Sequence, residues 1–108
     1  MNVRQLSTWQ VYRPAPEPDG AGGQTVTLSQ VALERGDVRE LVGVELIEAR
    51  QAGAEHTHSG YFRLRANIAR NDELRRGGEV LQVLTVVKAF PPGTDRLRVT
   101  ARTIEAGS

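Results

Sequence analysis

Apolar and polar residues alternate along much of the second half of the chain, with the two-residue period of β-strands that bury one face. Phe62 and Leu64 alternate with Tyr and Arg neighbours and are expected to point into a core. Nearer the C-terminus, the same alternation would bury Leu97, Val99 and Ala101. The pattern predicts two strands, each with one face in a core and one face in water.

A third strand is expected between these two, over residues 79–90, which contain more Val and Leu than strict alternation allows. Such a composition is typical of a well-covered strand. Gly77 and Gly78 can adopt the positive backbone angles of a tight hairpin turn, which would join this strand to a short one at 73–76. The Pro-Pro-Gly run at 91–93 should end the strand, because consecutive prolines cannot donate to a ladder.

The apolar pattern within this third strand changes phase. Leu81 and Val83 continue one inward face, but Val86 is out of phase with them. A β-bulge near Leu84 and Thr85 would account for the change. Because a bulge bends and coils a strand, we expect this one to help a small sheet close into a barrel.

Residues 6–13 also alternate, with Trp9 and Val11 on the apolar side, and predict a first strand in which Trp9 is the largest core residue. This strand is expected to stop at proline. Residues 14–23 contain three prolines and three glycines. That composition favours a flexible loop without regular structure.

Residues 24–35 predict a second strand whose phase changes near Ser29 and Gln30. Its alternating apolar residues are Val26, Leu28, Val31 and Leu33. A helix is the alternative there, although the β-branched residues disfavour it. Residues 36–54 have the composition of an inserted arm, with good helix formers in its second half and Gly53 as a natural stop. A helix this short is not stable alone.

Together these segments predict an all-β fold, a small antiparallel β-barrel of about six strands with a long loop or short helix inserted between the second and third strands. The 108 residues fit a single domain spanning 1–108. No apolar run approaches the roughly 20 residues of a membrane span, and the N-terminus lacks the apolar centre of a signal peptide. We therefore expect a soluble protein without a membrane partner.

Charge is distributed unevenly, although the formal net charge is only +1. Residues 1–59 contain five Arg and eight acidic residues, a net charge of −3, whereas residues 60–108 contain eight Arg, one Lys and five acidic residues, a net charge of +4. The low total argues against a strong general attraction to nucleic acid. The basic half could still form an outward basic face, or simply a solvated one. Its candidate residues are Arg63, Arg65, Arg98 and Arg102.

The predicted arm is acidic: residues 34–55 contain six acidic residues against three Arg. Such an arm cannot bind phosphates by charge. Its position between two strands of a rigid barrel suits contacts with a neighbouring molecule or the lining of a passage, with a solvated surface loop as the alternative. The candidate inter-subunit or channel residues are Asp37, Arg39, Glu40, Glu45, Glu48 and Arg50.

No candidate catalytic site is present in the sequence. The absence of cysteine excludes disulfides, thiolate zinc sites and cysteine nucleophiles, and no phosphate-binding glycine loop or serine elbow occurs. His56 and His58 would point the same way from a strand, but no third ligand accompanies them, so we expect interfacial or solvent-exposed histidines. We predict no enzyme activity, no metal and no cofactor.

Several short motifs follow one another along nearly the whole chain. A first strand ends in Arg-Pro, and a Gly/Pro-rich loop, a second strand and a Gly-x-Glu-Leu-x-Glu-Ala-Arg-Gln insertion at 43–51 come next. A strand from a Thr-His start to an Arg-x-Arg end follows at 57–65, and an Arg-Gly-Gly-x-Val-x-x-Val hairpin at 76–83 precedes a final strand of apolar and Arg residues. This order resembles the phage head-tail joining proteins, also called head-closure proteins, stoppers or head-tail adaptors, of long-tailed bacteriophages and gene transfer agents.

The resemblance implies a virion structural protein of the phage neck, made in the cytoplasm of the bacterial host. The implied partner is first the protein itself, in a homo-oligomeric ring with on the order of six or twelve copies. Further implied partners are the portal or adaptor protein, a tail terminator or tail tube protein, and packaged double-stranded DNA in the channel. Such a ring closes the filled head and docks the tail. The alternative is a free-standing nucleic-acid-binding barrel that uses the outward arginines.

Overall fold

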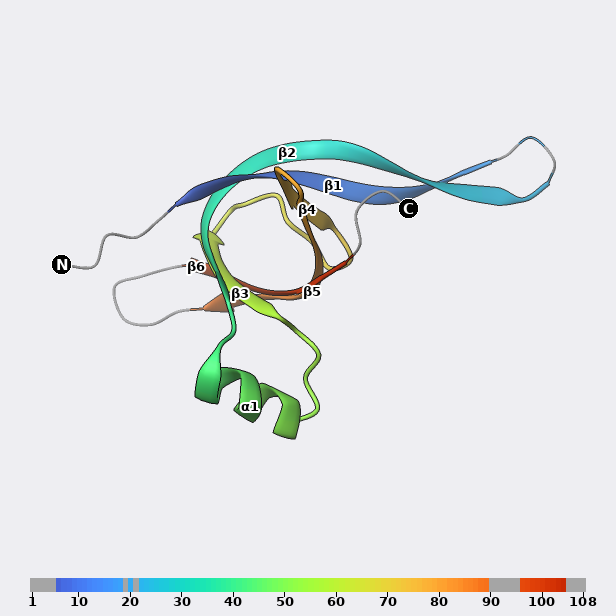
Figure 1. The fold of residues 1–108 in the computed structure, drawn as a ribbon. Helices are drawn as coiled ribbons and strands as arrows, with labels where there is room; N and C mark the ends of the chain where they lie inside the picture. Colours follow the sequence, from blue (N-terminus) through green and yellow to red (C-terminus); the bar gives the residue numbers. More distant parts are fainter. Residues whose placement is uncertain (1–5, 19, 21, 90–95, 105–108) are drawn as a thin grey trace.

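The computed structural model describes residues 6–18, 20, 22–89 and 96–104. Figure 1 shows the strands of this part curving around one core, with one helix lying apart from them. In chain order the elements are β1 (Ser7–Pro18), β2 (Gln24–Glu40), α1 (Gly43–Gln51), β3 (His58–Arg63), β4 (Glu73–Arg76), β5 (Glu79–Ala89) and β6 (Arg96–Thr103).

The strands form one closed barrel in the order β1-β2-β3-β6-β5-β4, and each pair of neighbours is antiparallel. This confirms the predicted small antiparallel barrel with a helical insertion between the second and third strands. Closure gives both long sides of a short strand such as β4 a partner, which would not be available at the edge of an open sheet.

The core consists of the inward faces of these strands, as the alternation predicts. Trp9 is the largest of its fully buried side chains. In the strands other than β2 the predicted inward residues are buried, and Leu64 is half-buried. The expected apolar face of 24–35 is wrong, because Ala32, Glu34 and Gly36 face inward on β2 and its larger apolar residues are exposed: Val26, Leu28, Val31 and Leu33. The core cluster is Trp9, Val11, Phe62, Ile68, Leu74, Leu81, Val83, Leu97, Val99 and Ala101.

Register shifts occur at two places in the barrel. The partner of β5 in β6 changes between Val83 and Thr85, so Leu84 has no partner and the expected bulge is confirmed. This bulge brings Val86 against the core. In the pairing of β1 with β2, Val31 has no partner, next to the expected change of phase.

The turn between β4 and β5 also agrees with the sequence. Arg76 pairs with Glu79 across it, and Gly77 has a φ of +59°, a conformation that favours glycine. The expected end of β5 at the Pro-Pro-Gly run of 91–93 lies outside the described residues.

The prediction that 14–23 lacks regular structure is wrong for its first half. β1 continues to Pro18, and Pro14 to Pro18 pair with the first residues of β2, so the two strands form a long hairpin that extends beyond the barrel (Figure 1). The prolines occupy alternate positions. In an antiparallel ladder alternate residues do not donate to the partner strand, so prolines at those positions leave the pairing intact. The expected flexible tip includes residues 19 and 21, which lie outside the described part.

The expected bounds of the inserted arm, 36–54, are wrong at the N-terminal side. Gly36 to Glu40 pair with β3 and form the end of β2, so the insertion begins at Leu41. The composition of residues 36–40 did not distinguish a strand from a loop, because charged residues occur on the solvent face of a strand as well as in loops. The helix itself is present, and Gly53, with a φ of +80°, follows its end as expected.

Candidate functional site

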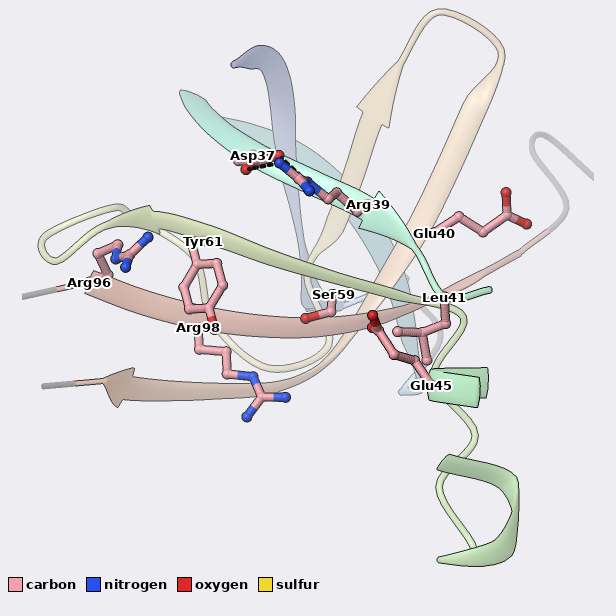
Figure 2. A pocket seen from close by; sticks show the side chains of 9 residues that line it. All are labelled: Asp37, Arg39, Glu40, Leu41, Glu45, Ser59, Tyr61, Arg96 and Arg98. Carbon is pink, nitrogen blue, oxygen red and sulfur yellow. Dashed lines mark hydrogen bonds and ion pairs between the residues drawn. The ribbon is translucent and has the colours of Figure 1, made fainter. Parts of the chain in front are cut away.

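A groove on the outside of the barrel lies between the outer faces of β2, β3 and β6 and the start of α1 (Figure 2). We call it the β2–β3–β6 groove. Its volume is about 370 Å³, near the lower limit for pockets that enclose small molecules. The lining residues are Asp37, Arg39, Glu40, Leu41, Glu45, Ser59, Tyr61, Arg96 and Arg98.

The two ends of this groove have opposite charge. Figure 2 shows Arg96, Tyr61 and Arg98 gathered toward one end and Glu45 at the other. Antiparallel pairing explains part of the arrangement, because Asp37, Tyr61 and Arg98 are successive cross-strand partners on β2, β3 and β6. A groove of this kind suits charged side chains of a second protein.

Asp37 and Arg39 form an ion pair at the upper rim of the groove. The Nε of Arg39 lies 3.1 Å from Oδ1 of Asp37. The hydrogen bond from Arg39 to this carboxylate raises the pKa of the guanidinium, and the charge of Asp37 adds to the effect. Because Arg39 is largely exposed, the pair is screened by water and contributes little to stability.

The basic end has cations without carboxylate partners among the described residues. The guanidinium of Arg96 lies over the ring of Tyr61, 4.7 Å from its centroid. Its Nε is buried and has no hydrogen-bond partner within the described part of the chain. Arg98 is exposed, and no carboxylate of the described residues forms an ion pair with it. Both arginines can pair with a carboxylate of another molecule.

The candidate residues of the arm divide between two places. Asp37, Arg39 and Glu40 lie on β2 and line the groove, where Glu45 of α1 joins them. The other two do not line it. Glu48 is exposed on α1, and the Nη1 of Arg50 donates to the carbonyls of Ala54 and His56, at 2.9 Å each.

The four arginines of the expected basic face have different surroundings. Arg63 binds Glu34, while Arg102 donates to Gln82 Oε1 and lies 3.9 Å from Glu55. Arg65 is exposed, and Arg98 is the one of the four that lines the groove. The structure therefore does not bring all four together at this groove.

Sequence reasoning missed two buried carboxylates. Glu34 accepts hydrogen bonds from the Nε of Arg63 at 3.1 Å and from the backbone amide of Asn67 at 2.8 Å. Burial would raise the pKa of Glu34, but these hydrogen bonds and the charge of Arg63 outweigh it, so the pKa is lowered. The apolar pattern gave the opposite expectation, because Val31 and Leu33 would point inward and Glu34 outward, whereas Glu34 is buried in the structure.

Asp72 is the second of these carboxylates. Arg13 binds it through two nitrogens, at 3.0 and 2.8 Å, and the backbone amide of Ala69 also donates to it. The hydrogen bond to Asp72 raises the pKa of Arg13. Together with Glu34, Asp72 ties the connection between β3 and β4 to the barrel, so both have a structural role.

The two histidines have different surroundings. Among the described residues, no three His, Cys, Asp or Glu side chains come together as metal ligands. His58 is buried on β3, contrary to the expected exposed position, with its Nε2 3.5 Å from Glu79 and its Nδ1 2.9 Å from Thr57 Oγ1. His56 lies before the strand, and burial, with Arg50 and Arg98 nearby, lowers its pKa.

Both segments that extend from the barrel carry exposed apolar side chains, as parts of the barrel surface also do. α1 has no buried residue and packs against none of the strands. Its apolar residues Val44 and Ile47 are 67% and 57% exposed. On the hairpin, Val26 and Leu28 share a face and are exposed too. Such apolar surfaces on projecting segments are typical of protein contacts.

Comparison with protein-family models and with curated proteins finds no match. Within the described part of the chain, no helix has the length and apolar character needed to cross a membrane. The function is therefore inferred from the residues, the fold and the groove.

Proposed function

We propose that this protein is a virion structural protein of the phage neck, a head-tail connector. In this role it forms a ring below the portal or adaptor protein, closes the DNA-filled head and docks the tail through a tail terminator or tail tube protein. It would be made in the bacterial cytoplasm and act in the virion.

The observation that supports this proposal best is a closed barrel from which the helix α1 and the β1–β2 hairpin project. A monomer gains little from exposed Val26, Leu28, Val44 and Ile47. A ring uses such surfaces, because each copy must give one surface to one neighbour and receive another from the next. Many weak contacts around one axis then add up to a strong closure.

The acidic residues of the insertion would suit the wall of a channel through which DNA leaves the head. Glu45 on α1 and Glu55 after the helix are exposed. Where such carboxylates face the bore, they repel the phosphates of the duplex and favour sliding over binding. The opposite arrangement, a continuous basic wall, would retain the DNA.

The experiment is to locate the protein in particles made by its own phage or gene transfer agent. A copy with an added epitope should be labelled at the neck, between head and tail, in electron micrographs. Replacing residues 43–51 with a Gly-Ser linker should yield folded protein but heads that lose DNA or lack tails. Label elsewhere on the particle, or normal ejection by the linker variant, would contradict the proposal.

A further inference from the structure

The exposed face of α1 and the β2–β3–β6 groove carry complementary charged and apolar groups. Val44, Ile47 and Glu48 are spaced i, i+3 and i+4, so they lie on one face of the helix. All three are exposed, and within the described residues the Glu48 carboxylate has no partner. This face presents two aliphatic side chains beside one free carboxylate.

The groove offers the matching groups at its basic end. Tyr61 is 37% exposed and supplies an apolar ring, while Arg96 and Arg98 beside it lack carboxylate partners among the described residues. A carboxylate placed between the two guanidinium groups would accept charge-assisted hydrogen bonds from them. An aliphatic side chain would cover the ring.

We propose that the Val44–Ile47–Glu48 face of α1 in one copy binds the basic end of the groove in a second copy. The Glu48 carboxylate pairs with Arg96 and Arg98, and Ile47 covers Tyr61. α1 cannot satisfy its own exposed face, because it packs against no strand of its own barrel. The inference rests on the proposed ring, for which it names the contact between neighbouring copies.

The chain contains no cysteine, so designed disulfides can test this contact without interference. One variant has Val44→Cys, which keeps Glu48 on the same helix face, and the other has Arg98→Cys, which keeps Arg96; both positions are exposed. The two are mixed in equal amounts and oxidised, and the linked dimers are separated by mass. Random collision makes the mixed dimer about half of the products. Docking should raise its share well above half.

The matched control replaces Arg98→Cys with Arg65→Cys, which is also an exposed arginine but lies outside the groove. Its mixed share with Val44→Cys should stay near half. Adding Arg96→Glu to the Arg98→Cys variant should lower the mixed yield several-fold, whereas adding Arg102→Glu should leave it unchanged. A mixed share near half for the 44–98 cysteine pair, or an equal mixed share for the Arg65→Cys control, would overturn the inference.

The cross-linking result and the location of the protein in particles test the contact and the proposed function separately. An excess of the mixed dimer in a protein that is absent from necks would leave the contact standing and remove the proposed function. Neck location combined with a statistical share would remove the contact alone.

Discussion

Two buried carboxylates, Glu34 and Asp72, have a structural role in this barrel through their ion pairs with arginines. Glu34 and Asp72 are buried at 4% and 1% exposure, and each is bound by an arginine from another segment. A buried carboxylate is stable only when its oxygens accept hydrogen bonds, and both acids meet that condition. They hold the β3–β4 connection in place while Ile68 of that connection fills the core.

Acid should weaken the Glu34 interaction in a predictable direction. Its pKa is lowered in the folded state, so its contribution is present above the ordinary value of about 4.3 and is lost as the pH falls through the folded value. Glu34→Gln should therefore unfold more easily at neutral pH and lose less stability on acidification. Urea unfolding at neutral pH and at about pH 3 measures both. The control is Glu48→Gln, an exposed position without an ion pair among the described residues, and its loss of stability on acidification should equal that of the wild type. If Glu34→Gln loses as much stability on acidification as the wild type, Glu34 is not the group responsible.

Gly36 allows the ring of Phe62 to lie against its backbone. A methyl group at position 36 would be 2.5 Å from ring atoms of Phe62, which is itself 2% exposed and cannot move aside. Gly36→Ala should therefore destabilise the barrel by about 1–3 kcal/mol. Thermal unfolding followed by circular dichroism checks this value.

The matched variant for that measurement is Gly78→Ala. Its new methyl group would meet nothing within 4 Å, and its φ is not positive. We expect a change of no more than about 0.5 kcal/mol. Equal losses at both positions would show that contact with Phe62 is not the cause.

At the scale of elements, α1 differs from every strand because tertiary packing does not support it. Its end is stabilised locally: the amide of Ala54 donates to the carbonyl of Ala49, and that of Gly53 donates to Arg50. These are the two bonds of a Schellman motif. The helix is thus a separate projecting piece on a rigid barrel, which suits a contact with another molecule.

Removal of α1 should leave the barrel intact. Replacing residues 43–51 with a Gly-Ser linker of equal length removes no buried side chain, so we expect a change in unfolding free energy of about 0.5 kcal/mol or less. Trp9→Ala, in the core, should instead cost about 3–5 kcal/mol. Chemical denaturation measures both, and loss of cooperative unfolding in the linker variant would show that the helix supports the barrel.

At the scale of the whole molecule, some of the arginines form ion pairs within the described residues. Arg13 and Arg63 bind buried carboxylates, and Arg75 binds Glu73. The arginines that remain without carboxylate partners among the described residues include Arg98 in its groove. This distribution supports contacts between proteins better than a grip on nucleic acid.

The free protein should therefore bind duplex DNA only weakly. We expect a dissociation constant no tighter than about 10 µM at physiological salt, in the range of nonspecific binding. Fluorescence anisotropy across a salt series measures it, with Arg98→Glu as the comparison. Micromolar or tighter binding that weakens steeply with salt would favour the alternative of a free nucleic-acid-binding barrel.

The sequence alone determined the features that depend on neighbouring residues. Alternation gave the inward residues of β5 and β6, and the phase change at Val86 gave the bulge, because side-chain direction along a strand follows a period of two. Gly53 likewise marked the end of α1. These are local properties of backbone geometry, so they can be predicted without the fold.

Only the tertiary structure decided how distant segments meet. It placed Asp37 and Arg39 on a strand instead of a loop, and it extended β1 through its prolines, because pairing with a partner strand outweighs local preference. It also brought Tyr61, Arg96 and Arg98 into one groove. That arrangement depends on strand order and register across the closed barrel, which a one-dimensional pattern does not contain.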